Sequence, residues 1–369
     1  MSYRPSLSDY GDHPPIISAR AAQTGPAVLL PGVTVIVPAF NEAATILDTL
    51  QSLLHQTIAP TQIIVVDDCS TDATAQVARR CAVTLLQPPV NTGSKAGAQN
   101  FALPHVTTEY TLAVDADTIV AADAIEQFLV VMKDRDIAAA CGLVVPRHVR
   151  TVWERGRYIE YLLAFSFYKP IQDHYGKPLI ASGCFSIYRT AVLLAHGGWP
   201  TRTMAEDMDL TWTMYAAGER VRFTPAPVCY PIEPHSFGLM RKQLRRWSHG
   251  FMQNVQLHWP RAIAIRYLRS AIGVALWEST AASILYLGVL PLAALVFQNP
   301  WLLLVYVLDA PALMAPVLTL AAQRNEFGRA LTSIPSFFLL RVVNCAFVLE
   351  AIWSEMIVRR PLVTYEKGH

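Results

Sequence analysis

The sequence predicts an α/β protein in which a mostly parallel sheet is followed by a small, helical transmembrane region. Short apolar runs alternate with helical stretches between residues 33 and 115, which favours parallel strands joined by right-handed crossovers. The 369 residues are 53% hydrophobic and have a mean hydropathy of +0.30, which is high for a soluble enzyme. Most of that excess lies late, because residues 272–322 carry only two charges, Glu278 and Asp309. The net charge of +2 is close to neutral, so no nucleic acid partner is expected.

On these grounds the chain divides into four parts. Residues 1–26 are polar and rich in Pro and Ser, as in a flexible tail, and residues 27–260 have the composition of an ordinary α/β domain. Residues 261–358 hold the apolar segments, and residues 359–369 form a basic and aromatic C-terminal tail. The six cysteines are scattered without a C-x-x-C pair, so we expect reduced thiols rather than a zinc site.

Four strands and three helices are expected at the start of the α/β domain. The strands are short, β-branched apolar runs of the kind buried on both faces of a sheet, at residues 33–38, 62–67, 82–86 and 110–115. Asn41 is expected to cap the first helix, which places Ile46, Leu50 and Leu53 on one face. The next two helices are expected at residues 73–81 and 95–103.

Polar residues follow each of these strands, at the sheet edge where parallel α/β proteins bind ligands. They are Pro38, Asn41 and Glu42 after the first strand, Asp67 and Asp68 after the second, Lys95 after the third, and Asp115 and Asp117 after the fourth. A dinucleotide-binding oxidoreductase is disfavoured, because the chain contains no G-x-G-x-x-G. Several carboxylates with one lysine instead suit a metal-bound diphosphate.

Asp115 and Asp117 are the candidate metal ligands. They lie two positions apart where the chain leaves a strand, so both carboxylates can reach one hard cation, Mg²⁺ or Mn²⁺. Such an ion would neutralise a departing diphosphate. Taken alone, the pair is better explained as a solvated acidic loop, since acidic pairs in loops are usually just solvated.

Two downstream segments carry further candidates. Ser182 and Gly183 interrupt an apolar run, and a glycine there often permits the close approach of a ligand. Glu206 and Asp207 open a helix, where a carboxylate can serve as a general base. The alternative is that these acids only stabilise the helix N-terminus through its dipole.

Gln243, Arg246 and Trp247 share one face of a predicted helix, being three and four positions apart. A guanidinium can bind a diphosphate through paired hydrogen bonds, and an indole can stack on a sugar ring. The neighbouring Arg241, Lys242 and Arg245 leave another interpretation open, that of a basic amphipathic helix lying on lipid headgroups.

Taken together, these segments resemble the family-2 glycosyltransferases of GT-A fold, in particular the branch with hyaluronan, chitin and cellulose synthases and some glycolipid synthases. The resemblance covers roughly residues 33–260, through stretches 35–42, 65–72, 91–100, 115–117, 182–189, 205–210 and 243–247 in the family's order. The chain departs from the family pattern at Ala205, where the Thr-Glu-Asp motif has its threonine, while both acids remain.

The resemblance assigns roles to the candidates. It implies a nucleotide-sugar donor whose base contacts Asp67, with Pro38, Asn41, Glu42, Asp68 and Lys95 around the nucleotide, and Asp115 and Asp117 holding the metal and donor. It implies that Asp207, with Glu206 beside it, deprotonates the acceptor in a single inverting displacement. Gln243, Arg246 and Trp247 are then expected at the diphosphate, and Ser182, Gly183 and Trp247 at the acceptor.

The rest of the chain predicts attachment to a membrane. Residues 153–169 and 239–259 have the pattern of interfacial helices, and crossings are expected at about 274–298 and 301–322. A third apolar segment, about 333–357, contains Arg341, Glu350 and Glu355, charges that should be paired if they are inside a bilayer. Three crossings would leave Arg359 and Arg360 outside, against the positive-inside tendency, so either this segment is interfacial or re-entrant or another crossing lies in residues 262–278. We expect residues 359–369 in the cytosol. Two or three crossings are expected in total.

We therefore expect an inverting glycosyltransferase that moves a sugar, by default from a UDP-sugar, to a lipid or glycolipid acceptor. The catalytic domain should face the cytoplasm at the plasma membrane of a prokaryote-like cell. Two alternatives are a processive polysaccharide synthase, favoured by the Gln-x-x-Arg-Trp motif, and a non-catalytic membrane subunit. The sequence leaves the oligomeric state open.

Overall fold

The computed structural model describes residues 29–262 and 265–363, so the whole of the expected N-terminal tail, residues 1–26, and the last six residues lie outside it. Within the described chain, one mixed sheet has the strand order β3-β2-β1-β4-β7-β6-β8-β5. The strands are β1 (Leu30–Ala39), β2 (Gln62–Asp67), β3 (Thr84–Leu86), β4 (Thr108–Val114), β5 (Ile119–Val120), β6 (Ile137–Val144), β7 (Phe185–Arg189) and β8 (Arg220–Tyr230). All four strands expected from the sequence are present.

Strands β3, β2, β1 and β4 run parallel, as expected for the first half of the sheet. Strand β7 then enters antiparallel to both β4 and β6, β8 is parallel to β6, and β5 closes the edge antiparallel to β8. The sheet is therefore mixed. The central strands β1, β2 and β4 are almost wholly buried apolar runs, because helices cover both faces of the sheet.

The helices of the α/β domain connect and cover these strands. They are α1 (Ile46–Leu54), α2 (Thr74–Ala78), α3 (Lys95–Ala102), η2 (Leu103–His105), α4 (Ala124–Met132), α5 (Val152–Leu163), the π-helical η3 (Ala164–Tyr168), α6 (Lys169–His174), α7 (Thr190–Ala195) and α8 (Glu206–Ala216). The C-terminal helices are α9 (Phe237–Ala262), α10 (Arg266–Ile284), the π-helical η4 (Leu285–Val289), α11 (Leu290–Val296), the 3₁₀ segment η5 (Pro300–Val307), α12 (Ala310–Gln323), α13 (Phe327–Ala351) and the π-helical η6 (Ile352–Val358).

The predicted helix cap at Asn41 is wrong. Helix α1 begins at Ile46 after Thr45, and no side chain caps it. Asn41 instead has a φ of 56°, a left-handed conformation that asparagine tolerates better than most residues. Its Oδ1 accepts hydrogen bonds from Thr71 N at 2.8 Å and Thr71 Oγ1 at 3.2 Å. Asn41 therefore joins the loop after β1 to the loop after β2 rather than starting a helix.

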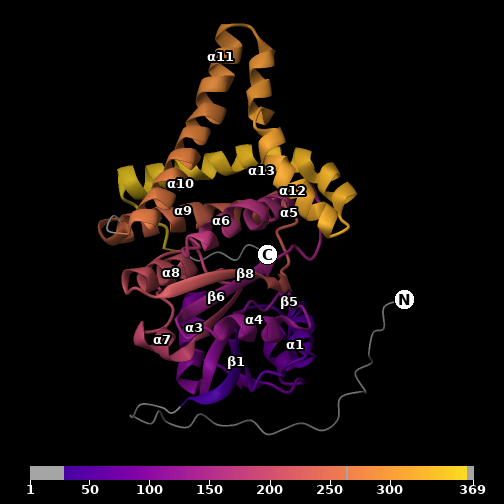
Figure 1. The fold of residues 1–369 in the computed structure, drawn as a ribbon, viewed down its shortest axis with the longest axis vertical. Helices are drawn as coiled ribbons and strands as arrows, with labels where there is room; N and C mark the ends of the chain where they lie inside the picture. The colour runs from indigo at the N-terminus through magenta and orange to yellow at the C-terminus, as the bar shows by residue number, and fades with distance from the viewer. Residues whose placement is uncertain (1–28, 263–264, 364–369) are drawn as a thin grey trace.

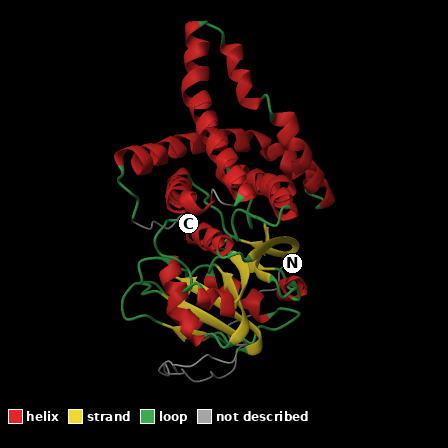
Figure 2. Ribbon diagram, turned by 60° about the vertical axis from the view of Figure 1, so that its left-hand side comes forward, coloured by secondary structure: helices red, strands yellow, loops and turns green. Residues whose placement is uncertain are grey.

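Helices α5, α9 and α13 form a layer between the sheet and the C-terminal hairpin (Figure 1). In both views α13 runs across the hairpin made by α10–α11 and η5–α12, rather than alongside its two arms (Figures 1 and 2). Helix α13 packs on α5 and α9, and it also contacts α10 and α12 of the hairpin. The α/β domain therefore meets the hairpin through a floor of three helices.

The expected interfacial helix at residues 153–169 is α5 with η3 and the start of α6. Its apolar face packs inside the protein: Tyr158 and Leu162 lie in a cluster with residues of α12 and α13, and Phe165 joins the core of the sheet. Lipid contact by this helix would have to use its exposed residues, such as Val152 and Phe167.

Three helices of the described chain are long and apolar enough to cross a membrane: Tyr267–Val296, Pro300–Gln323 and Phe327–Val358. This confirms the apolar segments expected from the sequence, by length and composition. The charges of the third are paired, as anticipated, but each with another element. Arg341 meets Asp309 at 2.7 Å, and Glu350 meets Arg245 at 2.7 Å.

Candidate active site

The loops after β2 and β3 are joined by two buried carboxylates, Asp67 and Asp68. Asp68 accepts hydrogen bonds from Thr92 N and Thr92 Oγ1, both at 2.8 Å. Asp67 accepts from Gln87 Nε2 at 2.8 Å and from Ser70 N at 3.3 Å. Both acids therefore shape the loops of the expected nucleotide pocket, and a base bound by Asp67 would have to share its carboxylate with Gln87.

Lys95, Asp115, Gly183 and Asp207 meet at the centre of this edge. Lys95 begins α3, forms an ion pair with Asp115 and donates to the carbonyl oxygen of Gly183 at 2.9 Å. Asp207, in the first turn of α8, accepts from Gly183 N at 2.8 Å and from Met208 N at 2.8 Å. The structure therefore brings together residues that are up to 112 positions apart in the sequence, counted from Lys95 to Asp207.

Gly183 allows this close approach, although the group that approaches it belongs to the protein. A Cβ at this position would stand 3.1 Å from Asp207 Oδ2 and 3.3 Å from Lys95 Nζ. The sequence indicated that a glycine here permits close approach of another group. The structure shows that the approaching groups are the side chains of Asp207 and Lys95. Ser182, next to it, accepts a hydrogen bond from Lys169 at the start of α6, at 3.3 Å.

Asp115 and Asp117 are the expected metal ligands. Asp117 is 4% exposed and accepts from Thr118 Oγ1 at 3.0 Å, while the side chain of Asp115 is 31% exposed beside Lys95. No group of three or more His, Cys, Asp or Glu side chains that could hold a metal occurs in the described residues. Two carboxylates nevertheless suit Mg²⁺ or Mn²⁺ when substrate phosphates and water supply the other ligands.

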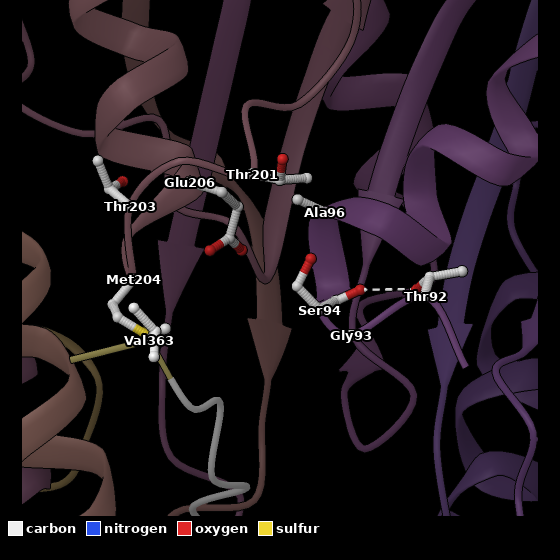
Figure 3. A pocket seen from close by; sticks show the side chains of 9 residues that line it. All are labelled: Thr92, Gly93, Ser94, Ala96, Thr201, Thr203, Met204, Glu206 and Val363. Atoms are coloured by element: carbon white, nitrogen blue, oxygen red, sulfur yellow. Dashed lines mark hydrogen bonds between the residues drawn. The ribbon is translucent and has the colours of Figure 1, made fainter. Parts of the chain in front are cut away.

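A pocket of about 180 Å³ opens beside this cluster. One wall is the loop that leads into α3, the other is the segment that leads into α8, and the C-terminal chain closes one end (Figure 3). The lining residues are Thr92, Gly93, Ser94, Ala96, Thr201, Thr203, Met204, Glu206 and Val363. Glu206 lies between the two walls in Figure 3, so this acid, not Asp207, lines the pocket itself.

Several charged side chains shift the pKa of Glu206. Burial raises the pKa of Glu206, the neighbouring Asp207 raises it further, and Lys95 and Arg246 act in the opposite direction. Arg246 of α9 therefore acts on the same group as Lys95 of α3. A buried acid between a second acid and two cations is the arrangement expected where an enzyme handles protons and anionic substrates.

Trp247 does not have both faces of its ring free for a sugar. The Arg157 guanidinium of α5 lies over the indole, 4.4 Å from the ring centroid, and 4.5 Å from the ring of Tyr161. Arg157 is also paired with buried Glu233 at 3.1 Å. The predicted stacking surface is therefore restricted to the other side of the indole, and Arg157 is a site residue that the sequence did not reveal.

Gln243 and Asp209 complete the helix contacts around the site. Gln243 is 9% exposed, and its Oε1 has no hydrogen-bond partner within the described part of the chain. Asp209 is fully buried and bonded to Arg202 and to His258 of α9, both at 2.7–2.8 Å. Burial alone would raise the pKa of Asp209, but the hydrogen bonds from Arg202 and His258 outweigh it and lower that pKa. Asp209 therefore fixes α8 against α9.

A mixed sheet of this order, with acids at the ends of β2 and β4 and at the start of α8, defines the class: a glycosyltransferase of GT-A fold. The family model described as "Glycosyltransferase like family 2" matches residues 31–250, and the chain belongs to that family. This confirms the resemblance drawn from the sequence.

Curated relatives agree with this assignment. The chain is 29% identical over 229 residues to the poly-beta-1,6-N-acetyl-D-glucosamine synthase of Staphylococcus aureus (strain COL), and this match covers 60% of the chain and 55% of the relative. It is 28% identical over 227 residues to the synthase of the same name from Staphylococcus epidermidis, covering 59% of the chain and 54% of the relative. The matched region thus spans about half the length of these relatives.

Among solved structures, the fold resembles a mannosyltransferase from Pyrobaculum calidifontis, PcManGT, in complex with GDP-Man and Mn²⁺. The TM-score is 0.58 at 22% identity, and the match covers 92% of both chains. The likeness therefore extends beyond the α/β domain into the C-terminal helices.

Proposed function

We propose that the protein transfers a sugar from a nucleoside-diphosphate sugar to an acceptor hydroxyl at the membrane surface, with inversion at the anomeric carbon. The observation that carries this proposal is the cluster at Gly183, where Lys95 paired with Asp115 meets Asp207. A cation for the diphosphate, one of the two candidate metal ligands and a base for the acceptor are thereby within reach of one substrate.

Asp207 is the proposed base. Hydrogen bonds from Gly183 N and Met208 N hold its two oxygens, which fixes its orientation without consuming every lone pair. As the acceptor oxygen forms its bond to the anomeric carbon, its proton passes to Asp207, and the bond to the diphosphate breaks. A single base suffices for one inverting displacement, whereas a retaining double displacement would also need a nucleophile.

The diphosphate needs positive charge as it leaves. Lys95 and Arg246 act on Glu206 from two different helices, so both lie near the same part of the pocket. Asp115 and Asp117 would hold Mg²⁺ or Mn²⁺, which supplies further neutralisation of the leaving group when bound. Lys95 and Arg246 contribute the same kind of stabilisation from the protein itself.

For the membrane, we propose two crossings, formed by α10–α11 and by η5–α12, with α13 lying in the surface. The two arms expose large apolar side chains such as Trp277, Leu295, Trp301 and Leu308. Helix α13 runs across them, rests on α5 and α9, and presents Leu331 and Leu339 outward (Figure 1). The catalytic domain and the C-terminal chain are then on the same, cytoplasmic side.

A lipid-linked acceptor fits this arrangement, because two crossings of one subunit enclose no channel for a growing polymer. The second candidate, a polysaccharide synthase, is favoured by the names of the staphylococcal relatives. Sizing the product made from labelled donor and membranes separates the two, since a synthase gives a ladder of chain lengths.

The donor panel that tests the function contains UDP-glucose, UDP-galactose, UDP-GlcNAc and GDP-mannose. UDP is the default from the family resemblance, GlcNAc is suggested by the staphylococcal relatives, and PcManGT is the reason to include GDP-mannose. We expect sugar transfer with one of them, lost on chelation of divalent ions and restored by Mg²⁺ or Mn²⁺. Failure of all four donors with several lipids and metals would favour the non-catalytic subunit.

Asp207→Asn is expected to abolish transfer, because the amide cannot take the acceptor proton, while the nucleotide still binds. Glu206→Gln, measured in parallel, shows which acid is the base. Asp136→Asn, on an exposed carboxylate outside the site, serves as the matched control. Unchanged turnover in Asp207→Asn together with lost turnover in Glu206→Gln would move the role of base to Glu206.

A further inference from the structure

The pocket is closed at one end by a segment that comes from the opposite end of the chain. After η6 the chain turns at Arg359, which has a φ of 58°, and residues 361–363 return to the α/β domain. Val363 lines the pocket beside Met204, and Glu206 lies beyond them (Figure 3). The shape of the pocket therefore depends on how this segment is held.

One buried carboxylate, Glu355 of η6, joins this segment to α9. Glu355 is 4% exposed, and its Oε1 accepts from Leu362 N at 2.9 Å and from Gln253 Nε2 at 2.9 Å, and lies 2.6 Å from His249 Nδ1. Hydrogen bonds to a charged acceptor are stronger than those between neutral groups. A single oxygen thus ties the C-terminal chain to α9, the helix that carries Arg246 and Trp247.

Gln253 of α9 extends these contacts to the pocket. Its Nε2 also donates to Leu362 O at 3.0 Å, and its Oε1 accepts from Met204 N at 2.9 Å. Met204 stands in the segment that leads into α8 and its acids. A continuous set of hydrogen bonds therefore runs from η6 through Gln253 to the wall of the pocket.

We propose that Glu355 and Gln253 are positioning residues of the transferase: they set the pocket by seating residues 361–363 against the segment that carries Glu206. Neither side chain lines the pocket, so both act through the backbone of Met204 and Leu362. The proposal rests on the proposed function and adds that η6, which continues α13, controls the geometry of transfer.

The test compares Glu355→Ala with Glu350→Ala, five positions earlier and paired at the surface with Arg245. By hydrogen exchange, we expect faster exchange of the amides of Leu362 and Met204 in Glu355→Ala and unchanged exchange in Glu350→Ala. We expect kcat of Glu355→Ala to fall at least about tenfold, since small displacements of reacting groups have effects of this size. Glu355→Gln keeps an acceptor oxygen, so its kcat should lie between that of Glu355→Ala and that of the wild type.

Leu362→Pro is the second variant, for the case that Glu355→Ala does not fold. It removes one backbone N–H and leaves the contacts of Glu355 with His249 and Gln253 intact. It should lower kcat and raise exchange at Met204, with nucleotide affinity changed much less. Equal kcat in wild type, Glu355→Ala and Leu362→Pro overturns the proposal, as does unchanged exchange at Met204. If the wild type transfers no sugar, the proposed function is wrong. The hydrogen exchange of Met204 and Leu362 would still show whether Glu355 holds residues 361–363 against the pocket wall.

Discussion

Gly183 is the residue at which Lys95 and Asp207 meet, because its carbonyl oxygen accepts from Lys95 and its N–H donates to Asp207. Gly183→Ala should lower kcat/KM by at least about tenfold, because the new methyl displaces Asp207 or Lys95 by a few tenths of an ångström or more. Steady-state transfer rates measure this. Gly238→Ala is the matched control, since a Cβ there meets no atom within 4 Å. Equal loss in both variants, or in neither, would contradict the role of Gly183.

Glu206 predicts a pH dependence of stability. Burial first, and Asp207 second, raise its pKa above the ordinary value of 4.5. The stability that Glu206 contributes is therefore fully present below pH 4.5 and is lost as the pH rises through its folded pKa. Glu206→Gln is neutral at every pH, so its melting temperature relative to wild type should increase between pH 4.5 and pH 8. A difference that stays constant with pH would contradict this.

Asp209 provides a comparison of opposite sign. Its pKa is lowered, so its contribution is present above the ordinary value of 3.8 and is lost as the pH falls through its folded pKa. Asp209→Asn should therefore melt below wild type at neutral pH, and the gap should narrow towards acid pH. Melting curves of Asp209→Asn and wild type over the pH range used for Glu206→Gln measure this difference.

At the residue scale the sequence could indicate the acids, because parallel strands bring their carboxyl ends to one edge. It could not indicate Arg157, Gln253 or Glu355, whose roles depend on the packing of α5, α9 and α13. Nor could it show that one face of Trp247 is covered, because Arg157 lies 90 positions away from it in the chain.

Among the elements, α5 is joined to the segment that precedes α9 by a buried ion pair. Arg157 and Glu233 have side chains only 2% and 3% exposed, and Arg157 lies between two aromatic rings. Arg157→Met leaves Glu233 buried without its partner, which typically costs about 3–5 kcal/mol. We expect a large fall in melting temperature, partly recovered in the double variant with Glu233→Gln.

Glu160→Gln is the control for that variant, because Glu160 also pairs with Arg157 but its side chain is 38% exposed. A pair with an exposed partner contributes about 0–1 kcal/mol, so little change in melting temperature is expected. If Glu160→Gln is as harmful as Arg157→Met, the stabilisation comes from the surface pair and not from the buried one.

The alternation of strands and helices in the sequence did not predict every element. Alternating strands and helices predicted the parallel half of the sheet, but the antiparallel entry of β7 is set by contacts with β4 and β6 far along the chain. Asn41 looked like a helix cap because its side chain suits that position, whereas its partner, Thr71, lies in another loop. Local pattern cannot reveal either arrangement.

For the whole molecule, hydropathy located the apolar helices but not their directions. The segment Phe327–Val358 is long and apolar enough to cross, yet α13 lies across the hairpin on a floor of helices (Figure 2). Two of its charged side chains pair with other elements, Arg341 with Asp309 and Glu350 with Arg245. Such charges are costly in lipid and ordinary at a protein-covered interface.

The two-crossing arrangement predicts the side of the C-terminus. Alkaline phosphatase, which needs an oxidising compartment for its disulfides, should be active when inserted at the hairpin turn after Gln298 and inactive when fused behind the last residue. A fluorescent protein that matures in the cytosol should show the reverse. Three crossings would make the phosphatase active at the C-terminus, and residues 361–363 could not then reach a cytoplasmic pocket. The same fusions therefore test whether α13 crosses the membrane. They also test whether residues 361–363 lie on the side of the membrane where they can reach Met204.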